Sequence, residues 1–138
     1  NVSCPNVEKS VVNEGLHKFL NKERKWCIIK LSTKTPYNLI DSYYNQGFRQ
    51  FHCCNTVPIT QGGLSGRSIQ PYSFKMANYI KTKYPNTEVI GGGGIQTTQD
   101  IVNYKTNGCS HFSVSTLLFH PYKFGKFYLN HIHKNTRV

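Results

Sequence analysis

Short apolar runs alternate with amphipathic segments along most of this chain. Four runs predict strands, because each is brief, rich in apolar residues and followed by polar residues or glycine. They cover residues 26–32, 47–55, 87–91 and 110–115, of which the second and fourth are more polar than a fully buried strand. Apolar positions at helical spacing in the remaining segments predict helices over residues 7–21, 36–45, 71–83, 97–107 and about 121–134.

This alternation predicts an α/β fold with a parallel sheet, since parallel strands are joined by crossover helices. Residues 56–70 form the longest stretch without a periodic pattern and are expected to be an irregular loop, and residues 1–6 are expected to end one further strand. Two helix starts show capping signals: Thr97 with Asp100 in the first turn, and Thr35 before a proline.

The chain is strongly basic, with 17 Lys and Arg against 6 Asp and Glu among 138 residues and a net charge of +11. Such a surplus indicates a polyanionic partner, an anionic small molecule, or simply a basic solvated surface. The lysines are scattered, and neither a recognition motif nor an aromatic-basic stacking platform appears, so nucleic acid is the least favoured of these partners. We expect no nucleic-acid partner.

The sequence also argues against a membrane or metal-binding protein. It has neither an apolar stretch long enough for a membrane span nor a recognisable signal segment. Its five cysteines lack the spacing of zinc ligands and are odd in number. These observations predict a cytoplasmic protein with no bound metal.

Candidate binding residues follow the predicted strands, where parallel α/β folds gather their ligands. Four glycines at 91–94 let backbone amides approach an anion, or form a merely tight turn. Ser115 and Thr116 follow the last strand and add hydroxyls, and together with the glycines they favour a phosphate site. Lys30, at the end of the first strand, would hold an anion there or else lie at the surface.

Cys4 is the one candidate for acid–base chemistry. A thiol serves as a general base when neighbouring donors or positive charge bring its pKa toward the working pH, although a lone cysteine is more often a packed residue. The other cysteines are interpreted as structural, and so are the three histidines within or next to predicted elements, His52, His111 and His120.

In this order, the strand-end motifs resemble those of the dihydroorotate dehydrogenase family, flavin enzymes built on a TIM barrel. The matching pieces are NVSCPN at 1–6, IKLS at 29–32, NT at 55–56, GGLSG at 62–66, IGGGGI at 90–95 and ST at 115–116. The resemblance implies that Cys4 is the base that takes a proton from C5 of dihydroorotate while hydride passes from C6 to FMN. With a cysteine at this position, the chain resembles the soluble class of the family.

The resemblance also implies the binding residues and the partners. The pyrimidine would be bound by Asn1, Asn6, Asn55 and Thr56, and FMN by Lys30, Gly66, Gly93, Gly94, Ser115 and Thr116. Lys30 would stabilise the reduced, anionic flavin. Fumarate, NAD and a quinone all stay open as electron acceptor.

A complete (β/α)₈ barrel takes about 250 residues. We therefore expect residues 1–138 to form one partial FMN-binding barrel domain with only about strands 4–8, a half-barrel. The missing N-terminal half or a second copy of the chain would complete it, the latter as a homo-oligomer, and the isolated chain is expected to turn over little or not at all. The alternative is a non-catalytic half-barrel that binds FMN or another phosphorylated ligand.

Overall fold

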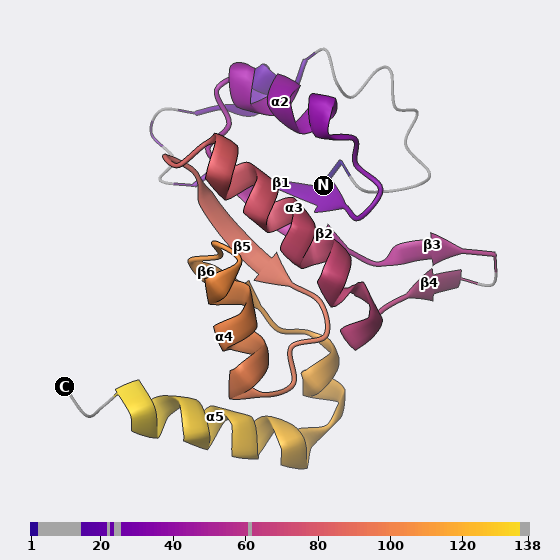
Figure 1. The fold of residues 1–138 in the computed structure, drawn as a ribbon, viewed down its shortest axis with the longest axis vertical. Coiled ribbons are helices and arrows are strands. Elements are labelled where there is room, and N and C mark those ends of the chain that lie inside the picture. The colour runs from indigo at the N-terminus through magenta and orange to yellow at the C-terminus, as the bar shows by residue number, and fades with distance from the viewer. Residues whose placement is uncertain (3–14, 22, 24–25, 61, 136–138) are drawn as a thin grey trace.

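The computed structural model describes residues 1–2, 15–21, 23, 26–60 and 62–135. Strands and helices alternate through this part of the chain (Figure 1). The strands of the main sheet are β1 (Ile28–Ser32), β2 (Gln50–Asn55), β5 (Glu88–Gly92) and β6 (His111–Ser113). The helices are α2 (Tyr37–Asn45), α3 (Gln70–Lys83), α4 (Thr98–Thr106) and α5 (Pro121–Asn135), with single turns at η1 (Leu16–Phe19), η2 (Arg67–Ile69) and η3 (Thr116–Phe119).

The main sheet is parallel, and its strands follow one another in chain order, β1-β2-β5-β6. Each strand therefore lies beside the next, as in a barrel, rather than in the rearranged order of an open doubly wound sheet. The predicted strands and the helices that connect them are all present, with ends displaced by one to three residues. The α/β prediction is confirmed.

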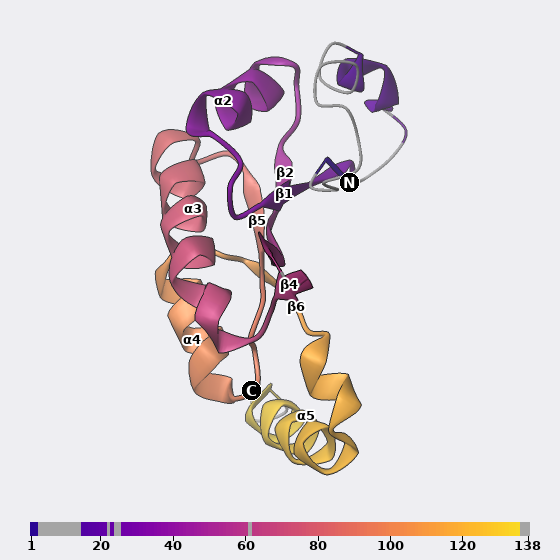
Figure 2. The same cartoon turned by 90° about the vertical axis from the view of Figure 1, so that its right-hand side faces the viewer.

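The connecting helices cover one face of the sheet. Figures 1 and 2 show α2, α3 and α4 on that face, while α5 lies beyond the far end of the sheet on the other side. The core lies between the sheet and the helices, with Phe51, Val89, Ile40, Ala77 and Ile80 fully buried. Burial of this apolar surface is the main force that holds the layers together.

The alternation of side chains along the strands decides which residues are left for function. Ile29 and Leu31 of β1 are buried toward the helices, so Lys30 between them faces the opposite side of the sheet. In β2, Phe51 and Cys53 are buried in the same way, and His52 shares the face of Lys30, with which it is in register. This second face, which is the interior side in a closed barrel, bears the candidate site.

The sheet is strongly curled. Trp26 precedes β1 at one edge of the sheet and His111 begins β6 at the other edge, yet their rings meet edge to face with centroids 4.7 Å apart. A flat four-stranded sheet would hold its outer strands about 14 Å apart at the usual strand spacing. The curl matches a partial barrel.

Two predictions about loops and helices are corrected. Residues 56–70 are not simply irregular: they contain an antiparallel hairpin of β3 (Val57–Ile59) and β4 (Gly62–Leu64), followed by η2. Because this pairing is antiparallel and only three residues long, it leaves little periodic signal in the sequence. Of the predicted helix at 7–21, the described part contains only the single turn η1, and residues 1–2 are not in a strand.

The capping predictions had different outcomes. Thr97 accepts a hydrogen bond from the Asp100 amide and forms a reciprocal capping box with that residue, as predicted. Thr35 does not cap α2, because Pro36 occupies the cap position and the Thr35 hydroxyl instead accepts from the Ser32 amide at 2.9 Å. Among the described residues, none of the helices combines the length and apolarity that crossing a membrane requires.

Candidate functional site

A small cavity lies at the carboxyl ends of the parallel strands. It measures about 110 Å³, which suits one phosphate-sized group rather than a whole dinucleotide or flavin, since pockets for larger ligands start at about 300 Å³. All four strands of the sheet contribute to it, directly or through the loop that follows them. Its lining consists of Lys30, His52, Cys54, Thr56, Ser65, Gly66, Ile69, Gly93, Gly94, Ser113, Ser115 and Thr116.

Most of the residues singled out in the sequence come together in this cavity. Seven of them line it: Lys30, Thr56, Gly66, Gly93, Gly94, Ser115 and Thr116. Asn55 ends β2 between two lining residues, whereas Asn1 is exposed and does not line the cavity. Cys4 and Asn6 lie outside the described residues. The shared location is observed, and the role of each residue stays a prediction.

The glycines at 93 and 94 allow two loops to pack backbone against backbone. Gly94 has φ +67°, and a Cβ there would lie 2.5 Å from the Gly66 carbonyl oxygen and 2.6 Å from the Arg67 amide nitrogen. Gly93 has φ +106°, and a Cβ there would collide with the Ile69 side chain. Only glycine fits both the conformation and the space. This wall of the cavity is therefore made largely of main chain.

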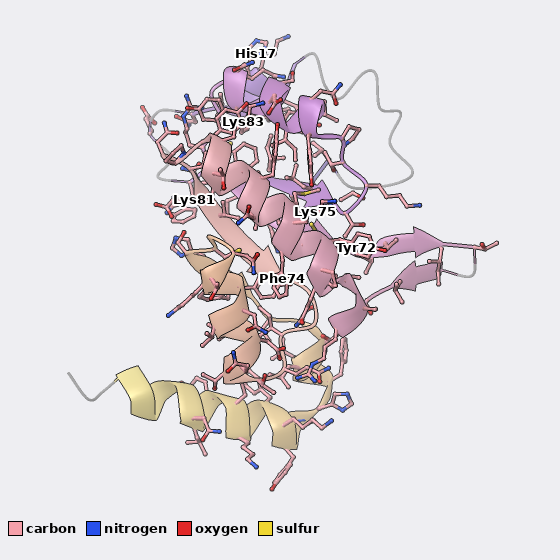
Figure 3. The ribbon with its side chains drawn as sticks, viewed as in Figure 1. His17, Tyr72, Phe74, Lys75, Lys81 and Lys83 are labelled. Atoms are coloured by element: carbon pink, nitrogen blue, oxygen red, sulfur yellow. The ribbon has the colours of Figure 1, made fainter. Side chains whose placement is uncertain are left out.

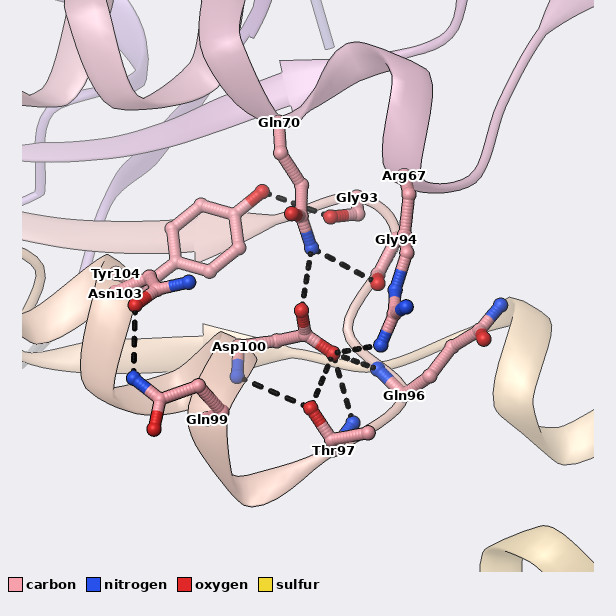
Figure 4. A network of polar contacts seen from close by, with 10 residues as sticks. All are labelled: Arg67, Gln70, Gly93, Gly94, Gln96, Thr97, Gln99, Asp100, Asn103 and Tyr104. Carbon is pink, nitrogen blue, oxygen red and sulfur yellow. Dashed lines mark hydrogen bonds and ion pairs between the residues drawn. The ribbon is translucent and has the colours of Figure 1, made fainter.

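A buried carboxylate holds the two loops together (Figure 4). One oxygen of Asp100 accepts from the amides of Gln96 at 3.0 Å and Thr97 at 2.8 Å, and from the Arg67 guanidinium at 3.2 Å. The other oxygen accepts from the Gln70 side-chain amide at 3.2 Å, and that amide also donates to the Gly94 carbonyl at 3.0 Å. Asp100 thus joins η2 and α3 to the glycine loop.

The electrostatics of Asp100 agree with this geometry. Burial by itself raises the pKa of the carboxyl, but hydrogen bonds from Gln96, Thr97 and Gln70 outweigh it and lower the pKa to about 2. The side chain is therefore ionised at neutral pH, with several donors around it. Sequence reasoning identified only its capping role, since its partners Arg67 and Gln70 lie some thirty residues away.

Two hydroxyls position the strand ends beneath the cavity. The Tyr104 hydroxyl lies 2.8 Å from both the Gly92 and the Gly93 carbonyl oxygens. The Ser73 hydroxyl lies 2.9 Å from the Cys53 carbonyl oxygen and 3.2 Å from that of Gly92. Both residues are fully buried and come from helices, so they attach β2 and β5 to the helix layer and keep the loops in place.

His52 is a lining residue that the sequence analysis interpreted as structural. Burial and the positive charge of Lys30 both lower its pKa, so the imidazole is neutral at neutral pH. A Cβ at Gly92 would lie 2.7 Å from its Nε2, so the ring packs directly on the glycine backbone. The signal in the sequence was the polar character of this strand, where a histidine replaces an apolar residue.

Three of the four described cysteines are packed in the interior, whereas Cys27 is only half-buried. Cys53, Cys54 and Cys109 are buried, and the Cys54 sulfur lies 3.6 Å from that of Met76. A hydrogen bond to Cys54 and burial raise the pKa of Cys53, and burial raises that of Cys109 to about 12, so both thiols are protonated at neutral pH. Within the described ranges, His, Cys, Asp and Glu form no cluster of three or more suited to a metal ion.

The arrangement as a whole is suited to an anion. Main chain at three glycines, the hydroxyl-bearing residues Ser115 and Thr116, and one lysine border the same small cavity. Among the described residues, no aspartate or glutamate lines it, and Asp100 is not among the lining residues. Amides and hydroxyls around a small space with one ammonium group are the usual surroundings of a bound phosphate.

Comparisons with known proteins agree with this description. The family model described as dihydroorotate dehydrogenase matches residues 20–136. Curated relatives include the catalytic subunit of dihydroorotate dehydrogenase B (NAD(+)) from Listeria monocytogenes, 34% identical, and dihydroorotate dehydrogenase A (fumarate) from Lactobacillus delbrueckii, 27% identical. Each alignment covers 86% of this chain and 47% of the relative, so the chain spans about half the length of these proteins.

Solved structures show the same fold. The ligand-free dihydroorotate dehydrogenase of Eimeria tenella superposes with a TM-score of 0.60 at 21% identity, over 70% of this chain and 31% of that one. Its complex with ferulenol gives a TM-score of 0.59. The parallel sheet described above is thus part of a TIM barrel, as the sequence predicted.

Proposed function

Because the chain belongs to the dihydroorotate dehydrogenase family, we propose that it supplies the half of a flavin-dependent barrel that holds the FMN phosphate and one side of a dihydroorotate site. The observation that supports this most directly is the cavity itself. Gly66, Gly93, Gly94, Ser115 and Thr116 are dispersed in the sequence and border one space of phosphate size. The rest of the flavin would extend beyond this cavity toward Lys30.

The residues present fit FMN at its phosphate end. The close approach of Gly94 to the Gly66 carbonyl keeps side chains out of this wall. Ser115 and Thr116 begin the segment that follows the last strand, where barrels of this type hold phosphate groups. When bound, FMN would supply the hydride acceptor for the oxidation of dihydroorotate to orotate.

The chain's own residues would bind the ligands and move one proton. Lys30, half-buried on the interior face of β1, would place its ammonium beside the flavin ring, and a neutral His52 next to it would add no competing charge. Asn1, Asn6, Asn55 and Thr56 are the proposed pyrimidine ligands. Cys4 is the proposed base for the C5 proton, while C6 loses its hydride.

Flavin binding and reduction test this proposal separately. The purified chain is titrated with FMN and followed by flavin fluorescence, first alone and then as the Thr116→Ala variant, with Thr106→Ala in α4 as the matched control. We expect only Thr116→Ala to weaken binding, by roughly tenfold to 150-fold for one lost hydrogen bond to a charged group. Equal affinity of Thr116→Ala and the unaltered chain would contradict the assignment of the phosphate site.

Reduction by dihydroorotate decides between enzyme and binding module. Under anaerobic conditions, dihydroorotate should bleach the flavin absorbance of the unaltered chain but not that of Cys4→Ala if the chain is an oxidoreductase. The second candidate function, a half-barrel that only binds a phosphorylated ligand, is favoured by the small size of the cavity, about 110 Å³. Retained flavin that dihydroorotate does not bleach would support that candidate, and a chain without flavin would indicate that the other half of the barrel is required.

A further inference from the structure

A groove on the outer surface has no part in the proposed flavin site. Two hollows of about 380 and 530 Å³ adjoin along α2 and α3 and share Tyr37 and Lys75. Neither shares a lining residue with the strand-end cavity. The groove, as we call the two hollows together, is lined by Thr33, Lys34, Thr35, Pro36, Tyr37, Tyr72, Lys75, Met76, Asn78, Tyr79, Thr82 and Lys83.

Tyrosines and lysines alternate along the wall that α3 forms. Tyr72, Lys75, Tyr79 and Lys83 are spaced by three, four and four residues, which places them on one face of the helix. Figure 3 shows Tyr72, Lys75 and Lys83 in this order from the start of α3 to its end. At 1.5 Å per residue the row is roughly 16 Å long.

The aromatic part of the groove is both accessible and held in place. Tyr72 is 55% exposed and Tyr37 is 37% exposed, so both rings are open to a ligand. Tyr37 stacks on Tyr79 with ring centroids 4.1 Å apart and planes 9° from parallel. The Tyr79 hydroxyl donates to Asp41 at 2.7 Å, so the stack is fixed before any ligand arrives.

The charge of the groove is positive. Within the part of the chain that the structure describes, its lining includes three lysines, Lys34, Lys75 and Lys83, and no aspartate or glutamate. Asp41 lies nearby, but its carboxylate is paired with Lys83 at 2.8 Å and accepts from Tyr79 and Tyr84. Because this ion pair also neutralises Lys83, the positive charge that the groove offers beside its aromatic rings comes mainly from Lys75, on a chain with a net charge of +11.

We propose that this groove binds a single-stranded polynucleotide. Lys75 would contact a phosphate, and the exposed rings of Tyr72 and Tyr37 beside it would stack on bases. An acidic peptide would form ion pairs with the lysines, but its carboxylates would not stack on the exposed aromatic rings. The sequence analysis expected no nucleic-acid partner because no aromatic-basic platform was recognised in the sequence, whereas the structure brings side chains of α2, α3 and the loop after β1 together.

Fluorescence anisotropy of a labelled oligouridine, titrated with the full chain, tests the proposal. We expect Tyr72→Ala to weaken binding by roughly fivefold or more, the range for loss of one stacked base, and Lys75→Ala to weaken it through loss of a phosphate contact. Tyr122→Ala and Lys105→Ala are the matched controls, because both side chains are exposed on helices far from the groove, α5 and α4. They are expected to change the affinity less than twofold.

Salt dependence and competition complete the test. Lys75→Ala should reduce the slope of log affinity against log salt by about 0.7, the contribution of one phosphate contact to a single strand. Equal losses in the groove variants and the controls would show diffuse charge attraction and overturn the proposal. So would the absence of binding by the unaltered chain, or competition by polyglutamate as strong as that by unlabelled oligouridine. None of these results depends on whether the chain binds flavin.

Discussion

Gly94 is the residue at which the candidate phosphate site depends most on main-chain geometry. Its φ of +67° and the approach of the Gly66 carbonyl oxygen to 2.5 Å from a Cβ leave no room for a side chain. We expect Gly94→Ala to cost roughly 1–3 kcal/mol of unfolding free energy, because it combines an unfavourable φ with a backbone collision. It should also weaken FMN binding at least as much as Thr116→Ala.

The control for this change is Gly125→Ala in α5. Gly125 has no heavy atom within 4 Å of a Cβ position, and alanine favours helix interiors by roughly 0.5–1 kcal/mol. Urea unfolding should therefore show this variant to be as stable as the unaltered chain or slightly more so. If Gly94→Ala behaved like Gly125→Ala, the packing of the two loops would not matter to stability.

Asp100 predicts a dependence of stability on pH. Its pKa falls from 3.8 in the unfolded chain to about 2 in the fold, so the ionised form stabilises the folded state above about pH 4. This contribution, about 2 kcal/mol, is lost as the pH falls from about 4 to about 2. In Asp100→Asn it is absent at every pH, and the side-chain amide would face donors instead of accepting from them.

The measurement is the difference in unfolding free energy between the unaltered chain and Asp100→Asn at neutral pH and near pH 2. The difference removes the titration of other groups, such as Asp41, whose pKa is also lowered. We expect a gap of about 2 kcal/mol or more at neutral pH that narrows in acid. A gap that is constant with pH would show that the variant only perturbs packing.

At the scale of elements, the start of α4 joins helix formation to the site. Thr97 and Asp100 cap each other, and the same Asp100 holds the glycine loop. We expect Thr97→Ala to lower the unfolding free energy by about 1 kcal/mol, the usual effect of losing such a cap. Thr98→Ala, one residue further on, is the control and should change it by less than about 0.5 kcal/mol. The measurement is chemical denaturation of both variants. Equal losses of unfolding free energy in Thr97→Ala and Thr98→Ala would show that the cap does not stabilise the fold.

At the scale of the whole molecule, we propose that the chain is one cooperative domain. Its sheet and helices share a single core, and Trp26, the only tryptophan, bridges the two edges of the sheet through His111. Tryptophan fluorescence therefore reports whether the edges stay together, while far-UV circular dichroism reports the helices. We expect the two urea transitions to coincide. A fluorescence transition that precedes the loss of helix would show that the curled sheet opens independently.

The order of the elements and the residues at the strand ends could be predicted from local patterns in the sequence. Apolar runs and helical spacing are local properties, so the parallel strands and the helices between them could be located from the pattern alone. The same is true of the glycines at 91–94 and of Ser115 and Thr116, because barrels place the ends of parallel strands on one face. The predicted cluster around the cavity thus followed from local signals and one topological rule.

Which distant residues meet depends on how the folded chain packs and could not be predicted from these patterns. The hairpin at 57–64, the contact of His52 with Gly92, and the bonds from Arg67 and Gln70 to Asp100 depend on pairing and packing between segments far apart in the chain. The groove of tyrosines and lysines arises in the same way, from two helices laid side by side. Local periodicity does not predict such contacts, because they depend on the register of the sheet and on how its layers pack.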